Sequence, residues 1–273
     1  MTQSEPTLSI VTISYNQAPF LRRAIDSVLS QTGVSFEYIV CDPGSTDGSR
    51  EIIDSYGDAI THRIYTPDKG PADGLNKGFA QARGRIFAYL NSDDVFLPGA
   101  FAQAERYLRD HPQIDVVSGH ALVTDGDDRV LRRVWSERYS RRMVAYNAAV
   151  VIQPSTFIRA EAFRRSGGFN PENRSTWDGE LLIDLYQSGA RFAVINEMMS
   201  CYRLHETSIT NSGSLIEDQR KMAAAKFRRL MGRDRRPYDA PIGAMLRLWK
   251  HARHPRATFE RIGKGRVFMR GAK

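Results

Sequence analysis

Apolar and polar positions alternate along the first third of the chain in a repeating strand–helix pattern. Leu8–Ser14 is rich in β-branched residues, as is typical of a buried strand, and Ala18–Gln31 carries apolar residues at helical spacing. The same criteria predict strands over Phe36–Cys41, Thr61–Tyr65 and Arg85–Leu90, a short helix ending near Tyr56, and a helix over Ala72–Ala82. Short Gly- and Asp-containing loops join these elements, so this part of the chain predicts a parallel, doubly wound sheet.

The second half of the chain has a less regular pattern. A pair of strands is predicted across the polar turn at residues 125–128, and a helix and two more strands follow later. The predicted elements are strands Val116–Val123 and Val130–Trp135, a short strand Gln153–Ile158, a helix Trp177–Gln187, strands Phe192–Ile195 and Met199–Arg203, and a basic amphipathic helix Ile216–Leu230.

Polar clusters follow the predicted strands of the first half. They are Ser14-Tyr15-Asn16, Asp42-Pro43-Gly44, Pro67-Asp68-Lys69-Gly70 and Asn91-Ser92-Asp93-Asp94. Ligands of open α/β sheets bind beyond the carboxyl ends of the strands, where these four clusters meet. A buried strand that ends in paired carboxylates indicates a positively charged ligand at that edge.

Length and composition place the chain among ordinary globular proteins. Its 273 residues, 41% of them hydrophobic and 26% charged, suffice for one large α/β domain or a domain with a helical appendage. No apolar run approaches the ~20 residues of a membrane span, and the first residues lack the pattern of a signal peptide. Cys41 and Cys201 match no metal or redox spacing, so we expect a reducing, cytoplasmic location.

Positive charge is concentrated at the C-terminal end. Residues 219–273 contain 17 Lys/Arg and 3 Asp/Glu, a net charge of +14, so the rest of the chain carries 8 − 14 = −6. This asymmetry indicates an anionic partner. Three interpretations stay open: the Gly243–Trp249 segment lies on an anionic membrane surface with its apolar side inward, the tail is solvated, or it makes a packing or oligomer contact.

Seven segments, in this order, resemble glycosyltransferase family 2, a large inverting group with the GT-A fold. They are SIVTISYNQ, IVCDPGSTDGS, PDKGPADGLNKGFAQARG, YLNSDD, QPSTFIRAEAFRRSGGFN, WDGELLIDL and YRLHETSIT. The resemblance covers roughly residues 7–211. It implies a Rossmann-like mixed central sheet flanked by helices, with a nucleotide-sugar half at about residues 1–97 and an acceptor half at about 98–211. A basic helical C-terminal extension, residues 212–273, lies outside it.

The resemblance also implies a reaction. A sugar would pass from a nucleotide-diphosphate donor, most often UDP-linked, to a hydroxyl of a glycan or polyprenyl-linked acceptor, on the inner face of the cytoplasmic membrane if the tail binds there. By family position, Asp42 hydrogen-bonds the nucleotide base, and the Ser14-Tyr15-Asn16 loop packs against that base. Asp68 and Lys69 approach the nucleoside and phosphates.

The family's DxD motif falls on Asn91-Ser92-Asp93. Its first position contacts the ribose or a metal-bound water, and its third binds a divalent metal, here Mn²⁺ or Mg²⁺, that would neutralise the diphosphate. Asn91 keeps hydrogen-bonding capacity but lacks the charge of an aspartate. His205, with Arg203, occupies the position that closes over the diphosphate, and we expect His205 to be a second metal ligand.

The catalytic base is expected at the start of the helix that follows the Gly-Gly-Phe turn. Family position favours Asp178, and Glu180 is its rival. Because residues two apart do not share a helix face, only one of the two carboxylates should point at the acceptor. An inverting transfer needs that carboxylate to take the proton of the acceptor hydroxyl.

Three other functions stay open at this point. Nucleotidyl transfer would need a Gly- and Arg-rich phosphate loop near the first strand, where the chain has SYNQAPFLRR. A nucleic-acid-binding protein is suggested by the pI of about 9.6, but the body is acidic and carries no recognised motif, so no nucleic acid is expected. A degenerate transferase that binds nucleotide without catalysis is allowed by Asn91.

Overall fold

A nine-stranded mixed sheet forms the centre of the computed structural model, which describes residues 5–205, 216–253, 255 and 258–260. The strand order is β3-β2-β1-β4-β8-β6-β9-β5, with β7 paired to β6 outside this path. The strands are β1 Leu8–Ile13, β2 Phe36–Cys41, β3 His62–Ile64, β4 Ile86–Asn91, β5 Val95–Phe96, β6 Val116–Thr124, β7 Val130–Val134, β8 Thr156–Arg159 and β9 Phe192–Arg203.

Strands β1 to β4 are parallel, as the strand–helix pattern predicts. Leu8 pairs with Phe36 of β2 and with Ile86 of β4, so the carboxyl ends of the three strands reach the same edge. Their connections are α1 (Ala18–Leu29), α2 (Ser49–Asp54) with the short 3₁₀ turn η1 (Gly57–Ala59), and α3 (Pro71–Ala80). The polar clusters of the first half therefore lie together at one edge of the sheet.

The second half makes the sheet mixed, as the family resemblance implies. Strand β8 runs antiparallel to both β4 and β6, while β9 runs parallel to β6 and antiparallel to β5. The predicted pair of strands across residues 125–128 is confirmed as the antiparallel pair β6–β7. The described residues of this half also form the helices α4 (Ala100–Asp110), α5 (Arg141–Ala145), α6 (Ala160–Ser166) and α7 (Trp177–Gln187).

Two sequence predictions in this half are wrong in detail. Residues Gln153–Ser155 form a 3₁₀ turn, η2, instead of the start of a strand, because Pro154 lacks an N–H and fixes φ. The two strands predicted over 192–195 and 199–203 are one continuous strand, β9. Polar Asn196 and Glu197 interrupt the apolar pattern there, but an irregularity in register lets the strand stay paired with β6.

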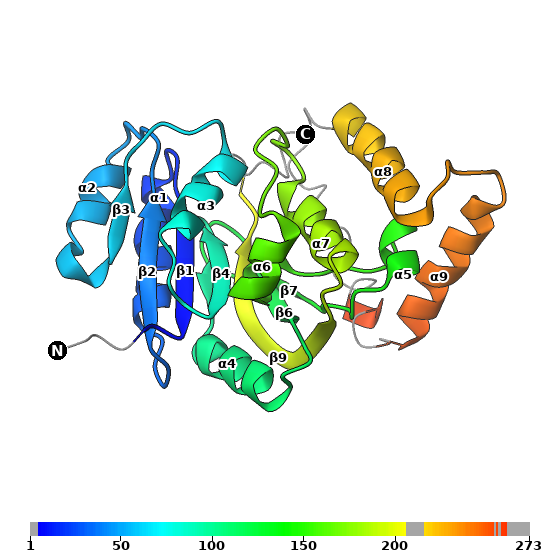
Figure 1. Cartoon of the computed structure of the whole chain (residues 1–273), viewed down its shortest axis with the longest axis horizontal. Helices are drawn as coiled ribbons and strands as arrows, with labels where there is room; N and C mark the ends of the chain where they lie inside the picture. The colour runs from blue at the N-terminus through cyan, green and yellow to red at the C-terminus, as the bar shows by residue number, and fades with distance from the viewer. Residues whose placement is uncertain (1–4, 206–215, 254, 256–257, 261–273) are drawn as a thin grey trace.

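Helices cover both faces of the sheet. Helices α1, α2 and α4 pack on one face through residues such as Ile25, Ile53 and Phe101. Helices α3, α6 and α7 pack on the other, through residues such as Leu75 and Leu181. The result is a three-layer arrangement with the sheet between two layers of helices, and the first part of the chain, drawn in blue to cyan, lies at one end of the molecule (Figure 1).

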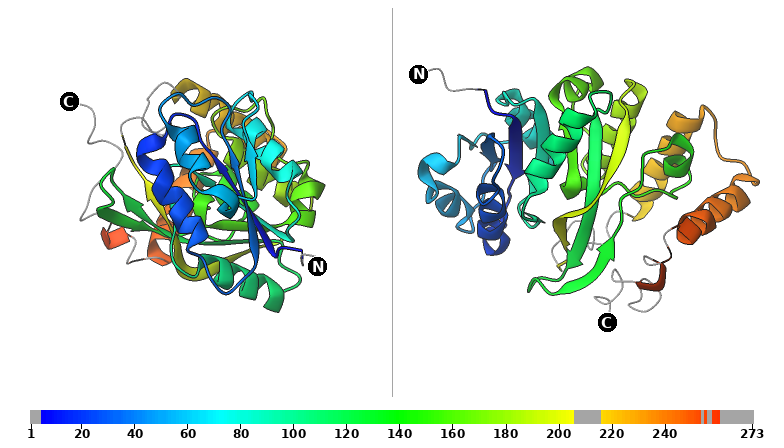
Figure 2. Two further views of the ribbon diagram at one scale, coloured as in Figure 1. Left: turned by 90° about the vertical axis from the view of Figure 1, so that its left-hand side faces the viewer. Right: turned by 90° about the horizontal axis from the view of Figure 1, so that it is seen from below.

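The described part of the basic extension includes the helices α8 (Ile216–Met231) and α9 (Asp239–Arg253), at the end of the molecule opposite strands β1 to β3 (Figures 1 and 2). Phe227 of α8 is fully buried against α5 (Arg141–Ala145) and Tyr146. Asp239 at the start of α9 accepts a hydrogen bond from the Tyr146 hydroxyl and pairs with Arg233. The described part of the extension therefore packs on α5 and Tyr146, while the predicted 211/212 boundary lies outside the described residues.

Within the described residues, no helix is both long and apolar enough to cross a membrane.

Candidate active site

The loop after β2 is built around Asp42, whose side chain is completely buried. Its carboxylate accepts hydrogen bonds from the amides of Gly44 and Ser45, from the Ser45 hydroxyl at 2.6 Å, and from Arg50 Nε at 3.2 Å. The guanidinium of Arg50 also stacks over the Tyr65 ring, 4.8 Å from its centroid. Asp42 thus holds the shape of its own loop.

The loop after β1 is tied to the Asp42 loop. The Asn16 amide donates to Ser45 Oγ, and Asn16 Oδ1 accepts from the Thr46 amide, at 2.8 and 2.9 Å. Asn16 has a φ of 52°, a conformation that Asn tolerates better than most residues. Tyr15 is 61% exposed, and the buried Ser14 hydroxyl has no partner among the described residues. An exposed aromatic ring beside two locked loops is suited to stack on a base.

Asp68 and Lys69 lie on the loop that leads into α3. Asp68 Oδ1 accepts a hydrogen bond from the Gly70 amide, and burial raises the pKa of the Asp68 carboxyl. The helix approaches so closely that a Cβ on Gly74 would stand 2.7 Å from Asp68 Oδ2, so only glycine fits there without a shift. The Lys69 amide donates to Asp73, and its side chain is exposed.

Asp93 and His205 come together at the end of β4. Nε2 of His205 lies 3.0 Å from Oδ2 of Asp93, although 112 residues separate them. The Phe20 ring packs on the imidazole, with centroids 4.4 Å apart. Both side chains are only slightly exposed, and carboxylate oxygen and imidazole nitrogen are common metal ligands.

The neighbours of Asp93 hold its loop in place. The buried Asp94 accepts a hydrogen bond from the Arg203 amide, and burial together with the adjacent Asp93 charge raises the pKa of Asp94 well above its usual range. The buried guanidinium of Arg203 donates to the carbonyls of Asp93, Asp125 and Gly126 and pairs with Asp128. Arg203 therefore faces the protein, in contrast to the position over the diphosphate that the family resemblance implies.

The Asn91 side chain contacts the 3₁₀ turn η2. Its amide donates to Gln153 Oε1 at 3.0 Å and lies 3.4 Å from Asp94 Oδ2, and Gln153 in turn donates to the Tyr89 carbonyl. Ser92 is buried in the turn between Asn91 and Asp93. The Asn91 side chain thus connects the first position of the DxD motif to η2. Because it is uncharged, it adds no further negative charge to those of Asp93 and Asp94.

Asp178 lies in the first turn of α7, next to the end of β4. Trp177 packs on Tyr89 with ring centroids 5.5 Å apart. Among the described residues, no side chain donates a hydrogen bond to the Asp178 carboxylate or forms an ion pair with it. Burial raises its pKa, against the opposing charge of Lys226 on α8. A desolvated carboxylate without a partner is a better proton acceptor than a solvated one.

Glu180 is occupied by structural contacts. Its carboxylate accepts hydrogen bonds from the side-chain amides of Asn173, at 2.6 Å, and Asn170, at 3.2 Å, and lies 3.7 Å from Arg229 of α8. Asn173 in turn accepts from the amides of Ser175 and Thr176. Glu180 therefore holds the 170–176 loop in front of α7, and its geometry favours Asp178 as the base.

Comparison with known families identifies the chain. The family model described as "Glycosyl transferase family 2" matches residues 9–167, more than half of the chain. The chain belongs to glycosyl transferase family 2. It is therefore a glycosyltransferase, as the seven sequence segments predict.

Relatives include polysaccharide synthases. The chain is 27% identical over 219 residues to a protein of Bacillus subtilis named as a putative teichuronic acid biosynthesis glycosyltransferase, covering 78% of this chain and 84% of that one. It is 30% identical over 214 residues to the chondroitin synthase of Pasteurella multocida, covering 76% of this chain but 22% of that one. It spans 65% of the length of an uncharacterised Nostoc glycosyltransferase, with 26% identity and 72% of this chain covered.

Solved structures of this glycosyltransferase's neighbours confirm the GT-A fold. TarS of S. aureus, in a complex with UDP-GlcNAc, superposes with a TM-score of 0.68 at 18% identity over 94% of this chain and 74% of that chain. The mannosyltransferase PcManGT of Pyrobaculum calidifontis, in a complex with GDP-Man and Mn²⁺, gives 0.64 at 18% identity over 96% and 74%.

The residues expected to hold a metal partly form a site. Asp93 and His205 provide two adjacent ligands, but no group of three or more His, Cys, Asp or Glu capable of holding an ion occurs among the described residues. Two protein ligands fit a metal whose other positions are filled by diphosphate and water oxygens. The supporting roles of Arg203 and Gln153 could not be predicted from the sequence, because only their long-range contacts reveal them.

Proposed function

We propose that this glycosyltransferase catalyses an inverting, metal-assisted transfer of a sugar from a nucleotide-diphosphate donor to a hydroxyl of a glycan or lipid-linked acceptor. The observation that carries the proposal is the partly buried carboxylate of Asp178, which lacks a side-chain partner in the described chain and lies beside the carboxyl end of β4. The Asp93–His205 pair follows the same strand.

The donor's nucleoside would bind at the locked loops after β1 and β2. Asp42 and Asn16 fix these loops through hydrogen bonds, and Tyr15 offers its exposed ring to the base. The Ser14 hydroxyl, the Asp68 carboxyl and the Lys69 ammonium are within the same cluster of strand ends and would contact ribose and phosphates. Asn91 and Ser92 would complete the donor side.

A divalent ion, Mn²⁺ or Mg²⁺, would be held by Asp93 and His205. When bound, it would neutralise the charge of the diphosphate leaving group. Arg203 and Asp94 support this pair from behind by fixing the backbone of the Asp93 turn. The Mn²⁺ complex of PcManGT supports a divalent ion in this fold.

Asp178 would act as the general base. Its raised pKa makes the carboxylate a stronger acceptor for the proton of the acceptor hydroxyl, while the hydroxyl oxygen attacks the anomeric carbon from the face opposite the leaving group. Glu180 and the two asparagines it binds would keep α7 and the preceding loop in place during this step.

The relatives favour a polysaccharide as product. Their names refer to chondroitin, hyaluronan and teichuronic acid synthesis, and the TarS complex holds UDP-GlcNAc, whereas PcManGT holds GDP-Man. We propose a UDP-linked donor as the first to test and a growing surface glycan as acceptor.

Sugar transfer from a panel of UDP- and GDP-sugars, with Mn²⁺ and an oligosaccharide acceptor, tests the proposal. We expect transfer by the wild type and by Asp58→Asn, a matched change at an exposed aspartate, but not by Asp178→Asn. Donor binding without transfer by the wild type would instead favour a degenerate transferase.

The helix α9 would place the enzyme on an anionic membrane surface. Met245 and Leu248 are 61% and 70% exposed on it, and Trp249 is half exposed beside Lys250 and Arg253. Apolar side chains flanked by cations are typical of interfacial helices. Co-sedimentation with phosphatidylglycerol vesicles should fall in Met245→Ser/Leu248→Ser and stay unchanged in Asp58→Asn. Equal sedimentation of the two variants would contradict membrane binding by this face.

A further inference from the structure

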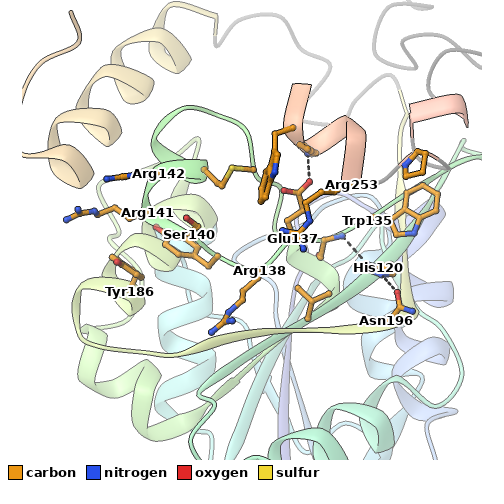
Figure 3. Close-up of a pocket in the computed structure, with 17 residues that line it drawn as sticks. His120, Trp135, Glu137, Arg138, Ser140, Arg141, Arg142, Tyr186, Asn196 and Arg253 are labelled. Carbon is orange, nitrogen blue, oxygen red and sulfur yellow. Dashed lines mark hydrogen bonds and ion pairs between the residues drawn. The ribbon is translucent and has the colours of Figure 1, made fainter. Parts of the chain in front are cut away.

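A cavity lies between the second half of the sheet and helix α9. Its volume is about 880 Å³, within the range of sites that hold drug-sized ligands. Strands β6 and β9, the segment 135–143, the end of α7 and the end of α9 surround it (Figure 3). None of the donor-side residues discussed above lines it.

The cavity is strongly basic. Its lining includes the cations Arg138, Arg141, Arg142, Lys250 and Arg253, against one carboxylate, Glu137. Lys250 pairs with that carboxylate at 3.1 Å. Arg138, Arg141 and Arg142 are exposed and form no ion pair within the part of the chain that the structure describes. Figure 3 shows Arg141 and Arg142 extending to one side of the cavity and Arg138 in another direction. Guanidinium groups without an ion pair attract carboxylates or phosphates.

Aromatic rings form the walls. Tyr139 stacks between Tyr186 and Phe192, with ring centroids 5.1 and 4.6 Å away, and Trp135 and Trp249 line other sides. The Tyr139 hydroxyl is buried and has no hydrogen-bond partner among the described residues. Flat apolar surfaces next to polar atoms suit sugar rings, which have both apolar faces and hydroxyl edges.

A polar floor completes the cavity. His120 Nδ1 accepts a hydrogen bond from the Ser136 amide, so its Nε2 carries the proton and donates to Asn196 Oδ1 at 3.1 Å. Figure 3 shows His120 and Asn196 side by side beneath Trp135. This arrangement leaves the Asn196 amide NH₂ as a donor for a hydroxyl or carboxylate of a ligand.

We infer that this cavity binds an anionic saccharide, a glycan that bears carboxylate or phosphate groups, as a distal subsite for the acceptor chain. The inference rests on the proposed transferase function. Asp178 in the first turn of α7 and Tyr186 in its last lie about 12 Å apart along the helix axis, a distance that an oligosaccharide spans. The subsite would hold the grown chain while its end meets the base.

Fluorescence or calorimetric titration of the full chain with defined oligosaccharides tests this inference. Hyaluronan oligosaccharides supply carboxylates, glycerol-phosphate oligomers supply phosphates, and dextran oligosaccharides of equal length are neutral. The variants are Arg138→Ala/Arg253→Ala in the cavity, the matched exposed change Arg106→Ala on α4, and Met245→Ser/Leu248→Ser on α9.

We expect either the hyaluronan oligosaccharides or the glycerol-phosphate oligomers to bind. The series that binds shows whether the cavity recognises carboxylates or phosphates. Arg138→Ala/Arg253→Ala should weaken that binding by about tenfold or more, which corresponds to about 1.4 kcal/mol, and Arg106→Ala should not. Equal binding of dextran, or unchanged affinity in the cavity variant, would overturn the inference. A third result would also overturn it: no oligosaccharide binds to the wild type, and anionic vesicles bind to the wild type but not to Arg138→Ala/Arg253→Ala.

The same proteins titrated with UDP or GDP and Mn²⁺ separate this inference from the proposed function. The cavity variant should bind the nucleotide as the wild type does, because the cavity contains none of the donor-side residues. Absence of nucleotide binding in every protein would contradict the donor site alone.

Discussion

The loops that follow β1, β2 and β4, which we call the donor edge, differ from the basic cavity in how their polar side chains are held. At the donor edge, Asp42, Asn16 and Arg203 are held by several hydrogen bonds each, to backbone and to one another. In the cavity, Arg138 and Arg141 extend from the surface without ion pairs among the described residues. The side chains of the first region are already ordered, whereas the cavity arginines would have to be ordered when a ligand binds.

In our proposal, the ordered loops bind the nucleotide donor, and the exposed arginines determine which acceptor binds. Preformed loops can recognise a nucleotide diphosphate at little entropic cost, since few side chains must be ordered on binding. Exposed arginines supply charge complementarity, which varies easily with sequence. Substitutions at the donor edge should therefore impair folding and catalysis together, while those in the cavity should change only acceptor affinity.

The largest effect is expected from Asp178→Asn. Removal of a general base lowers the rate of transfer by about 10²–10⁴-fold, while donor binding should persist. Because burial raises the pKa of Asp178, the folded state binds its proton more tightly than the unfolded state, and this group's contribution to stability decreases as pH rises above the unfolded value. Asp178→Asn should therefore melt at or above the wild-type temperature at pH 7.

The pH profile of kcat/KM checks the same residue. Since the base must be deprotonated, the acidic limb of this profile should have an apparent pKa above the ~3.9 of an ordinary aspartate. A profile that remains flat down to pH 4, or an Asp178→Asn variant with more than a tenth of wild-type activity, would exclude Asp178 as the base.

Phe227→Ala tests whether the C-terminal helices unfold together with the rest of the chain. The ring is fully buried against α5 and Tyr146, so its loss should cost about 3 kcal/mol of unfolding free energy. We expect one thermal transition at lower temperature, measured by calorimetry, because α8 packs on the acceptor half. A body transition that keeps its wild-type midpoint would show that the extension is not coupled to it.

Arg203→Met tests the support of the Asp93 turn. The substitution removes buried charged hydrogen bonds to the carbonyls of Asp93, Asp125 and Gly126, at a cost of about 2 kcal/mol. Chemical denaturation should register this loss, and metal-dependent nucleotide binding should weaken as well. Unaltered nucleotide affinity in a destabilised variant would mean that the turn does not depend on Arg203.

Glu180→Gln should have the smallest effect. Glutamine keeps one oxygen acceptor for Asn173 but loses the attraction to Arg229, so we expect a loss of about 1 kcal/mol in stability. Transfer activity should stay within a few fold of the wild type. Activity reduced as far as in Asp178→Asn would assign the base to Glu180 instead.

Local sequence patterns predicted the parallel half of the fold because each strand and helix there has its own hydrophobic period. The same patterns did not predict the continuous strand β9, because its pairing with β6 overrides the polar residues in its middle. They also did not predict the turn at Gln153–Ser155, because Pro154 fixes the backbone there. Positions in a family motif pointed to Asp93 and His205. The roles of Arg203 and Asn91 depend on contacts more than 60 residues away, which no local pattern contains.

Calorimetric titration of UDP, dTDP and GDP into the wild type and Asp93→Ala, with Mn²⁺ and with a chelator, tests the central claim most directly. The account predicts that one nucleotide binds in the presence of Mn²⁺, that the chelator weakens this binding, and that Asp93→Ala weakens it about tenfold or more. Nucleotide binding that is equally tight with chelator, and unchanged in Asp93→Ala, would contradict a metal-assisted donor site at the end of β4.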